Sequence, residues 1–308
     1  MNPSPPPRFV LLSLLALAMS ACSSSSQPTA PAGPCDAWMD TSLSPDARAQ
    51  ALVEAMTLEQ KIDQTHGDAP PEDFRVVLGI EELCIPDLTV TNGPAGVGPG
   101  PEIFNNVPAT ALPSPLLLAA TWDPVMAGKY GDVQGIEMNA IGRNLLEAPD
   151  VDLARIPING RTFEAYGEDP WLISRIGVAN IQAIQSHDII AMVKHYTVNN
   201  QEAQRNFINA VVSERTLREI YLPPFEAAVV EAEVSSVMCA YNSVNGAFSC
   251  ENEEILTNIL KGDWGFRGFV QSDFFAMKST VPSANAGMDL EMPRADFFGP
   301  PLLEAVND

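Results

Sequence analysis

The sequence contains few basic residues. Lysine and arginine number 17 against 39 aspartates and glutamates in 308 residues, which gives a formal charge of −22 at pH 7. A protein that binds nucleic acid through phosphate contacts needs lysine and arginine in excess, so this class of partner is excluded. The same shortage argues against docking on an anionic membrane surface through basic side chains.

Histidine and cysteine are scarce as well. The three histidines, His66, His187 and His195, are scattered, and the five cysteines form no C-x-x-C motif, so no metal site is indicated. Residues 92–100 are rich in glycine and read N-G-P-A-G-V-G-P-G. Their prolines block the start of a helix, so this loop is not a nucleotide-binding fingerprint, and we expect no cofactor.

The rest of the composition is that of a globular protein. Hydrophobic residues make up 46% and charged residues 18% of the chain, which argues against intrinsic disorder. The length allows one large barrel domain or two ordinary domains, and either can bury a sizeable core. We find no internal repeat, and no linker after Pro34.

The N-terminus is typical of a secretion signal. Arg8 provides a positive charge before an apolar stretch at residues 9–19, which is too short to span a membrane as a helix. The following M-S-A-C motif resembles a bacterial lipobox, which predicts a signal peptide over 1–21 and a lipid on Cys22. Ordinary cleavage near Ala21, leaving a free thiol, is the alternative. Residues 22–34 have the composition of a flexible Ser/Pro-rich tether.

These features predict an exported protein with one folded domain over residues 35–308. It would be a periplasmic or cell-surface lipoprotein that touches the membrane only through Cys22, or otherwise a secreted protein. Because export exposes the chain to an oxidising compartment, the remaining cysteines can form two disulfides. Cys239 with Cys250 is the favoured pair since it closes a short loop, and buried thiols are the alternative, above all for Cys84.

Strand-like and helix-like segments alternate along the chain. Short apolar runs predict strands at 88–91, 116–121, 151–154, 189–193, 234–240 and 268–271. Helical patterns occupy 171–185, 214–221, 225–233 and 252–260, with a break at Pro223 and Pro224. This alternation predicts a parallel sheet, either in a (β/α)8 TIM-type barrel or in a doubly wound fold.

Polar residues at the ends of the apolar runs favour the barrel. The pairs 91–92, 194–195, 241–242 and 272–273 each follow a predicted strand. In a (β/α)8 barrel the carboxyl ends of the strands converge and build the active site. A doubly wound sheet gathers its ligand at one switch point, usually with a glycine-rich phosphate loop.

Several of these residues are candidates for chemistry. Asp273 suits a nucleophile or base at a barrel mouth, or equally a helix N-cap. Lys194, His195 and Arg205 suit cations that bind hydroxyls and keep a carboxylate ionised, or solvated charges at a strand end. Tyr241 suits a hydroxyl that orients a nucleophile, or a core aromatic. For Arg161, which stands among carboxylates, a structural ion pair is the favoured interpretation from the sequence alone.

A series of ordered motifs resembles glycoside hydrolase family 3, from about residue 50 to residue 308. The motifs are K-H-Y at 194–196 with Asn199, Asn200, Glu202 and Arg205; E-R-T-L-R-E-I-Y-L-P-P-F-E at 214–226; S-V-M-C-A-Y-N at 236–242 with Asn245 and Gly246; W-G-F at 264–266; S-D at 272–273; and A-G-M-D-L-E-M-P at 286–293.

The resemblance implies a retaining β-glycoside hydrolase with a (β/α)8 barrel and no cofactor. It acts on β-glucosides or related β-linked oligosaccharides through a covalent glycosyl-aspartate intermediate. Asp273 matches the catalytic nucleophile, and Tyr241 matches the tyrosine beside it. The residues implied to bind the sugar are Asn92, Arg161, Lys194, His195, Arg205, Met238 and Phe274.

Three positions depart from the family pattern. The family usually has aspartate at Asn92, which grips the outer hydroxyls of the sugar, and often has arginine at Gly98. Hydrogen bonds to charged groups contribute about 1.5–3 kcal/mol against about 1 for neutral ones, so the loss of the carboxylate predicts about tenfold weaker sugar binding or a change of sugar. Phe274 replaces a common tryptophan and offers a smaller stacking face.

The acid/base residue has no match in the chain. Two-domain members carry it on a second α/β domain, and a single-domain branch uses a His–Asp pair after K-H, where residues 196–202 read Y-T-V-N-N-Q-E. Glu164, Glu168 and Glu202 match structural or binding positions instead. We therefore expect a barrel that is incomplete at its C-terminus and an absent second domain that supplies the acid/base. A β-xylosidase and a non-catalytic sugar-binding remnant are the alternatives.

Overall fold

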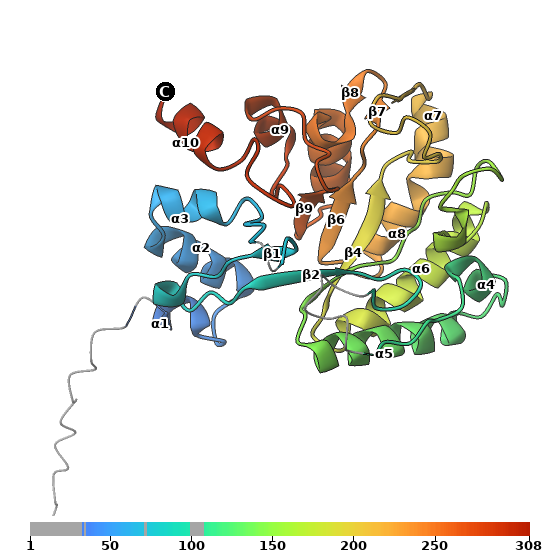
Figure 1. The fold of residues 1–308 in the computed structure, drawn as a ribbon, viewed down its shortest axis with the longest axis horizontal. Coiled ribbons are helices and arrows are strands. Elements are labelled where there is room, and N and C mark those ends of the chain that lie inside the picture. Colours follow the sequence, from blue (N-terminus) through green and yellow to red (C-terminus); the bar gives the residue numbers. More distant parts are fainter. Residues whose placement is uncertain (1–32, 34, 71–72, 99–107) are drawn as a thin grey trace, which may run out of the picture.

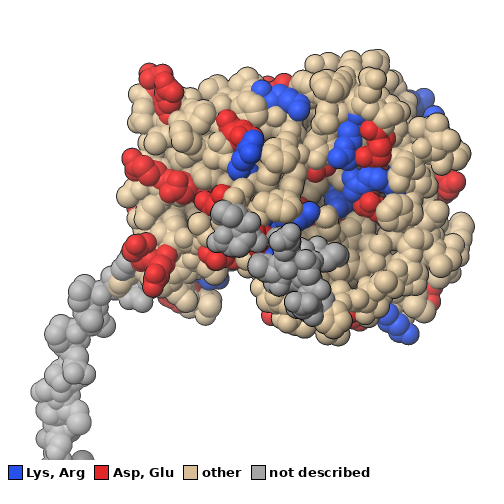
Figure 2. All heavy atoms as spheres, in the orientation of Figure 1, with Lys and Arg blue, Asp and Glu red and all other residues tan. Residues whose placement is uncertain are grey.

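The computed structural model describes residues 33, 35–70, 73–98 and 108–308. The predicted signal peptide, the predicted lipidation site Cys22 and nearly all of the predicted tether lie outside the described residues. In the described part of the chain no helix combines the length and apolarity needed to cross a membrane. Acidic side chains dominate the left edge of the face shown in Figure 2, where α1–α3 and α10 lie.

The protein has an α/β fold built on a curled sheet of six strands (Figure 1). The order along the sheet is β1-β2-β3-β4-β6-β9, and all neighbours are parallel except the antiparallel pair of β1 and β2. The strands are β1 (Val76–Val77), β2 (Leu88–Asn92), β3 (Leu145–Glu147), β4 (Ile190–Tyr196), β6 (Ser236–Cys239) and β9 (Phe269–Ser272).

Isolated bridges continue the hydrogen bonding from β9 toward β1. Gln271 bridges to Leu290, and Glu291 bridges to His66, both in parallel. The Asp68 backbone amide then donates to the Val76 carbonyl at 3.0 Å. Two extended segments therefore lie between the two outer strands of the sheet.

The sheet buries both of its faces. Leu146, Val193 and Val237 belong to the large core between the sheet and the helices, while their neighbours Leu145, Met192 and Met238 belong to a smaller cluster inside the curl. This alternation follows from the two-residue period of a strand, which turns successive side chains to opposite faces. The small cluster fills the inside of the curl, so the space for a site lies at the ends of the strands.

Three helices cover the outer face of the sheet: α5 (Pro124–Ile141), α6 (Pro170–Gln185) and α8 (Pro223–Val230). The helix predicted at 171–185 is confirmed as α6. The Asp169 side chain accepts from the backbone amides of Trp171 and Leu172, and Pro170 occupies the first turn, which is the usual chemistry of a helix start. Its buried isoleucines, at 173, 176, 181 and 184, face the core.

The remaining elements surround this core. The other helices are α1 (Asp36–Met39), α2 (Pro45–Ala55), α3 (Leu58–Asp63), α4 (Pro115–Ala119), α7 (Glu214–Thr216), α9 (Val281–Ala286) and α10 (Pro300–Asn307), with π-helical stretches at Leu217–Tyr221 and Glu254–Asp263. A small second sheet joins β5 (Asn209–Ala210), β7 (Ser243–Val244) and β8 (Ala247–Phe248).

Two of the expected strands are wrong. The segment 116–121 is not a strand: most of it belongs to α4, because Ser114 caps Leu117 and Pro115 starts a helix. The strand expected at 151–154 lies earlier, at β3, and 151–154 is a buried loop. The expected break between two helical segments is present, but it lies at Leu222, and Pro223 and Pro224 begin α8, since proline fits the first helical turn.

The structure contains two disulfides. Cys239 pairs with Cys250, eleven residues apart, and Cys35 pairs with Cys84, 49 residues apart. The first is the favoured short-loop pair, and the second joins the start of α1 to the residue after the 3₁₀ turn Glu81–Leu83. Cys84 is therefore not a buried thiol.

Candidate active site

A polar cavity of about 370 Å³ lies at the carboxyl ends of the parallel strands. This volume is in the range of small-molecule sites. All nine residues predicted to bind or react with a sugar line it, together with Glu202, which the sequence matches to a structural or binding position, and with Arg75 and Glu147, to which the sequence assigns no role. The lining is Arg75, Asn92, Glu147, Arg161, Lys194, His195, Glu202, Arg205, Met238, Tyr241, Asp273 and Phe274.

Asp273 follows β9 directly and is held by its backbone. Its amide donates to the Cys239 carbonyl at 3.1 Å, and its Oδ1 accepts from the Phe274 amide at 2.7 Å. Burial raises the pKa of this carboxyl, while Lys194, the Phe274 amide and the Tyr241 hydroxyl oppose the rise. The carboxylate thus lies at the cavity with donors and a cation arranged around it.

His195 lies between two carboxylates and a guanidinium. Its Nδ1 is 2.9 Å from Asp152 Oδ2 and 3.7 Å from Asp150 Oδ2, and its Nε2 is 2.9 Å from Arg161 Nη1. Because arginine only donates, Nε2 must accept, so the proton of the neutral ring sits on Nδ1 and is donated to Asp152. Burial, with Arg161, Lys194 and Arg205 nearby, holds the pKa of His195 well below its ordinary value.

Arg161 satisfies both interpretations of its sequence pattern. It makes a two-pronged ion pair with Glu164, through Nε at 3.0 Å and Nη2 at 2.7 Å, and it also lines the cavity. The pair fixes the plane of the guanidinium. That leaves Nη1 for His195, so the ion pair positions a functional group instead of excluding one.

Lys194 is a buried cation at the cavity, with 2% of its surface exposed. Burial and Arg161 lower its pKa, and the nearby carboxylates Glu147, Glu164 and Asp150 oppose that effect. An ammonium in this position offers three donors to sugar hydroxyls or to Asp273.

Aromatic side chains form the opposite wall. The Arg205 guanidinium stacks on the Tyr241 ring at 4.1 Å and donates to Glu202 at 2.7 Å. The Tyr241 hydroxyl donates to the Phe274 carbonyl at 2.8 Å. Phe274 offers a ring beside Asp273, and Met238 on β6 adds a buried apolar surface. Apolar faces of this kind suit the C–H faces of a sugar ring.

Asn92 ends β2 and joins two charged neighbours. With its amide oriented so that both polar atoms are satisfied, it donates to Glu147 Oε2 at 2.8 Å and accepts from Arg75 Nη2 at 2.9 Å. Gly98 lies directly against it, because a Cβ added at Gly98 would come within 3.1 Å of the Asn92 Cβ.

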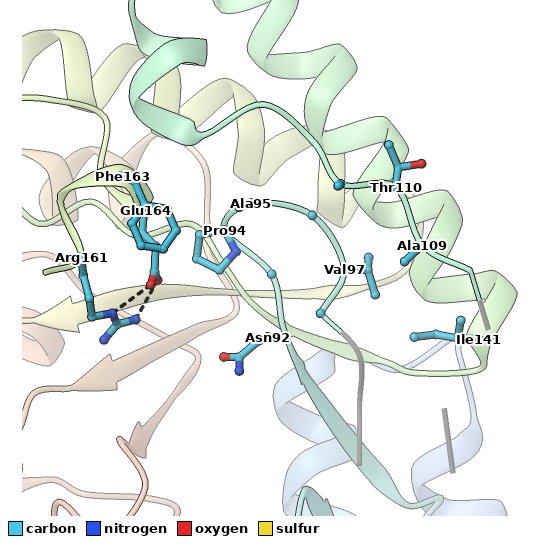
Figure 3. Close-up of a pocket in the computed structure, with 14 residues that line it drawn as sticks. Asn92, Pro94, Ala95, Val97, Ala109, Thr110, Ile141, Arg161, Phe163 and Glu164 are labelled. Carbon is cyan, nitrogen blue, oxygen red and sulfur yellow. Dashed lines mark hydrogen bonds and ion pairs between the residues drawn. The ribbon is translucent and has the colours of Figure 1, made fainter. Parts of the chain in front are cut away.

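A second hollow, more apolar, adjoins this cavity and shares Asn92 and Arg161 with it. Its other walls are the loop 93–98, residues 109–111, Ile141, Phe163 and Glu164. Figure 3 shows the ion pair of Arg161 and Glu164 at one side of this hollow and Ile141 at the other. The sugar-sized polar cavity thus opens beside a less polar surface.

A cluster of possible metal ligands lies beneath the cavity. Ligand atoms of Asp150, Asp152 and His195 lie within 4.8 Å of one another. Nδ1 of His195 is hydrogen-bonded to Asp152, so the cluster orients the imidazole as it stands.

Sequence reasoning missed Arg75, Glu147 and Asp152. Glu147 directly follows Leu145 and Leu146, and the rule that polar residues follow strands would have found it if β3 had been placed there. Two apolar residues are too short a run to predict a strand. Arg75 and Asp152 lie outside strands and reach the site only through contacts distant in sequence.

Comparison with known proteins agrees with this geometry. Residues 101–296 match the glycosyl hydrolase family 3 N terminal domain. The chain belongs to this family. A β-glucosidase from Rhizobium radiobacter is 42% identical over 242 residues, which are 79% of this chain and 29% of that protein. Thermostable beta-glucosidase B from Acetivibrio thermocellus is 40% identical over 248 residues, 79% of this chain and 32% of that protein.

A solved structure gives the same picture for this family 3 chain. DesR, a β-glucosidase from Streptomyces venezuelae in complex with D-glucose, superposes with a TM-score of 0.79 at 39% identity. The superposition covers 84% of this chain and 34% of DesR. The chain thus spans about a third of the length of the relatives it matches.

Proposed function

We propose that this chain binds the non-reducing sugar of a β-glucoside and carries the nucleophile of a retaining glycosidase. The observation that carries the proposal is the position of Asp273, a carboxylate with 13% of its side chain exposed at a sugar-sized cavity that also holds Lys194, His195 and Arg161. The similarity to named β-glucosidases supports glucose as the sugar.

The chemistry follows from the ionised carboxylate. Asp273 attacks the anomeric carbon, the bond to the leaving oxygen breaks with its electron pair, and a glycosyl-aspartate ester forms. Water then attacks the same carbon and gives up one proton, and the bond from that carbon to Asp273 breaks, which releases the sugar and the carboxylate. Lys194 lies close enough to favour the anion of Asp273, and Phe274 and Met238 shape the sugar face of the cavity.

We further propose that the leaving group receives its proton from a group outside the described residues. Glu147 and Glu202 are the other carboxylates of the cavity, and each is bound to an arginine at 2.7–2.8 Å. A carboxylate that accepts hydrogen bonds from an arginine is committed to that partner. A second domain of the family's kind is the expected source.

The full fold that we propose is a (β/α)8-type barrel. The curled parallel sheet, the interior cluster of Val77, Leu145, Met192 and Met238, and the bridges that run from β9 toward β1 support it. Export and lipid attachment at Cys22 are also proposed, on the lipobox-like sequence. Expression in a bacterial host with a labelled fatty acid tests this, since Cys22→Ser should abolish the label.

Covalent trapping tests the function. The chain is incubated with 2,4-dinitrophenyl 2-deoxy-2-fluoro-β-glucoside, whose leaving group needs no acid, and its intact mass is measured. We expect the mass of one fluoroglucosyl group to be added to the wild type and none to Asp273→Ala. No addition to folded wild type, or an addition that survives Asp273→Ala, contradicts the proposal; glucose binding without addition would favour the non-catalytic alternative. The corresponding xyloside distinguishes a β-xylosidase.

A further inference from the structure

Glu147 occupies an unusual position in the cavity. It is the last residue of β3, and it lies opposite Asn92 in the parallel register of β2 and β3. Its side chain is only 3% exposed, and it lines the cavity with Asp273 and Lys194. The chain therefore places a buried carboxylate beside the amide that ends the neighbouring strand.

Three donors from three separate segments hold this carboxylate. Arg75 donates at 2.8 Å and Asn92 at 2.8 Å to Oε2, while Gln271 on β9 donates to Oε1 at 3.2 Å. A carboxylate has about four acceptor sites, so capacity remains for a further donor. The network fixes the orientation of Glu147 before any sugar arrives.

Arg75 is fixed in the same way. Its guanidinium lies 4.7 Å from the centre of the Phe274 ring and pairs with Glu147, and its side chain is 14% exposed. A buried ion pair costs more in desolvation than it returns unless its geometry is excellent, so such pairs are weak devices for stability alone. Here the ion pair faces a polar cavity. Its arginine lies over the ring of Phe274, which borders the proposed nucleophile.

We propose that Glu147 and Arg75 are specificity-determining residues that hydrogen-bond hydroxyl groups of the sugar, with Asn92 as a positioning residue for Glu147. This rests on the proposed function. Each sugar hydroxyl both donates and accepts, so a fixed carboxylate beside a fixed guanidinium matches a pair of neighbouring hydroxyls. The charge of Glu147 raises the pKa values of Lys194 and Asp273, so Glu147 lies close to both side chains at the same cavity.

The proposal revises the consequence of the amide at position 92. From the sequence alone, the absence of a carboxylate there predicts weaker sugar binding. In the structure the carboxylate comes from the next strand, and the amide of Asn92 donates to it. A site that binds a hydroxyl with a buried charged group rejects the analogue that lacks the hydroxyl much more strongly than an apolar site does.

Deoxy sugars provide the test. The reagent of the trapping experiment is prepared with the 3-, 4- or 6-hydroxyl removed, and the second-order rate of dinitrophenolate release is compared with that of the parent compound. For the wild type we expect removal of at least one hydroxyl to lower the rate by about 10- to 100-fold. In Glu147→Gln the penalty at that position should fall to about threefold or less, because the amide cannot replace the charge.

A matched control separates this effect from loss of a partly buried ion pair in general. Asp289 pairs with Lys261 at 2.8 Å, and neither residue lines the cavity. Asp289→Asn should lower the melting temperature and leave all deoxy penalties as in the wild type. If Glu147→Gln fails to fold, Arg75→Lys takes its place. Lysine keeps the positive charge but lacks the planar set of N–H donors of the guanidinium.

The outcomes distinguish the two proposals. Unchanged deoxy penalties in folded Glu147→Gln, or in folded Arg75→Lys where that variant takes its place, overturn the inference while the trapping reaction itself still stands. A wild type that forms no glycosyl adduct with any reagent overturns the proposed function. A penalty that falls equally in Asp289→Asn also overturns the inference, because the effect would then be one of general stability.

Discussion

The Nε2 atom of His195 lies 3.7 Å from Oδ2 of Asp273. The same nitrogen accepts a hydrogen bond from Arg161 at 2.9 Å, so its lone pair is directed at Arg161 and it carries no proton to donate to the carboxylate. His195 is therefore neutral and is not the group that protonates Asp273 or a leaving oxygen. Its contacts hold Arg161 beside Asp273, the proposed nucleophile, and Asp152 fixes the other side of the ring.

Replacement of Asp152 should slow glycosylation, by less with asparagine than with alanine. Asp152→Asn keeps an oxygen for Nδ1 of His195, and we expect the trapping rate to fall about tenfold; Asp152→Ala releases the ring, and we expect a fall of about 100-fold, the size that a small misplacement of a reacting group produces. Stopped-flow release of dinitrophenolate measures both. A rate in Asp152→Ala equal to that of the wild type contradicts the positioning role.

The buried carboxyl of Asp150 should make stability depend on pH. Burial raises its pKa to about 6 from an ordinary value of 3.8, against the opposing influence of Arg161 and Lys194. The folded state then binds this proton more tightly than the unfolded state. The contribution to stability is complete below about pH 4 and is lost as the pH rises through about 6.

Asp150→Asn has no carboxyl group to ionise at this position, so it should not lose this stability as the pH rises. Relative to the wild type, its free energy of unfolding should rise by about 1–3 kcal/mol between pH 4 and pH 7. Urea unfolding at four pH values, followed by circular dichroism, gives the difference directly. A difference that is constant with pH, or that falls as the pH rises, contradicts the assignment.

The strand ends were the most predictable part of the site. Lys194 and His195 follow the apolar run I-I-A-M-V at 189–193, and Asp273 follows the short strand segment F-V-Q-S at 269–272. Parallel strands bring such ends together. Arg161 was ambiguous because its partner Glu164 is three residues away, and local sequence favours a local pair. The structure shows the pair and the cavity role together.

Glu147 and Arg75 could not be predicted for a different reason. Their ion pair joins residues 72 positions apart, and it depends on β1 running antiparallel to β2. No local pattern indicates that reversal, since β1 has only two residues. Likewise α4 was mistaken for a strand because three consecutive leucines fit both structures, and the serine and proline before them decide the outcome.

The two disulfides should differ in their effect on activity. In the loop-closure model, loss of the Cys239–Cys250 link costs about 3 kcal/mol and loss of the longer Cys35–Cys84 link about 4 kcal/mol. Cys239 directly follows Met238 and lies two residues before Tyr241, both at the cavity, whereas no lining residue belongs to α1 or to 81–84.

We therefore expect serine pairs at the two links to separate stability from rate. Cys35→Ser with Cys84→Ser should unfold at lower urea concentration and keep the trapping rate. Cys239→Ser with Cys250→Ser should unfold at lower urea concentration and should also show a lower trapping rate. Urea unfolding curves and trapping rates measured below the transition check this, and a normal rate in the second pair would show that the link does not support Tyr241.

Tyr241→Phe should move the acid limb of the pH profile. The hydroxyl lowers the pKa of Asp273, whereas burial raises it. Without the hydroxyl the carboxyl holds its proton to a higher pH, so the fraction of the nucleophile that is ionised at a given acidic pH falls. The rate of glycosylation should decline at higher pH than in the wild type, and its plateau should drop because Phe274 loses its hydrogen bond.

Tyr196→Phe is the matched control for this change. Tyr196 is fully buried, and its hydroxyl donates to the Ile255 carbonyl at 2.8 Å, away from the cavity lining. Its loss should cost about 1 kcal/mol of stability and leave the acid limb in place. The two profiles, measured with the dinitrophenyl reagent from pH 4 to pH 8, decide the matter. An unshifted limb in Tyr241→Phe means that the hydroxyl supports the loop of Phe274 without tuning the nucleophile.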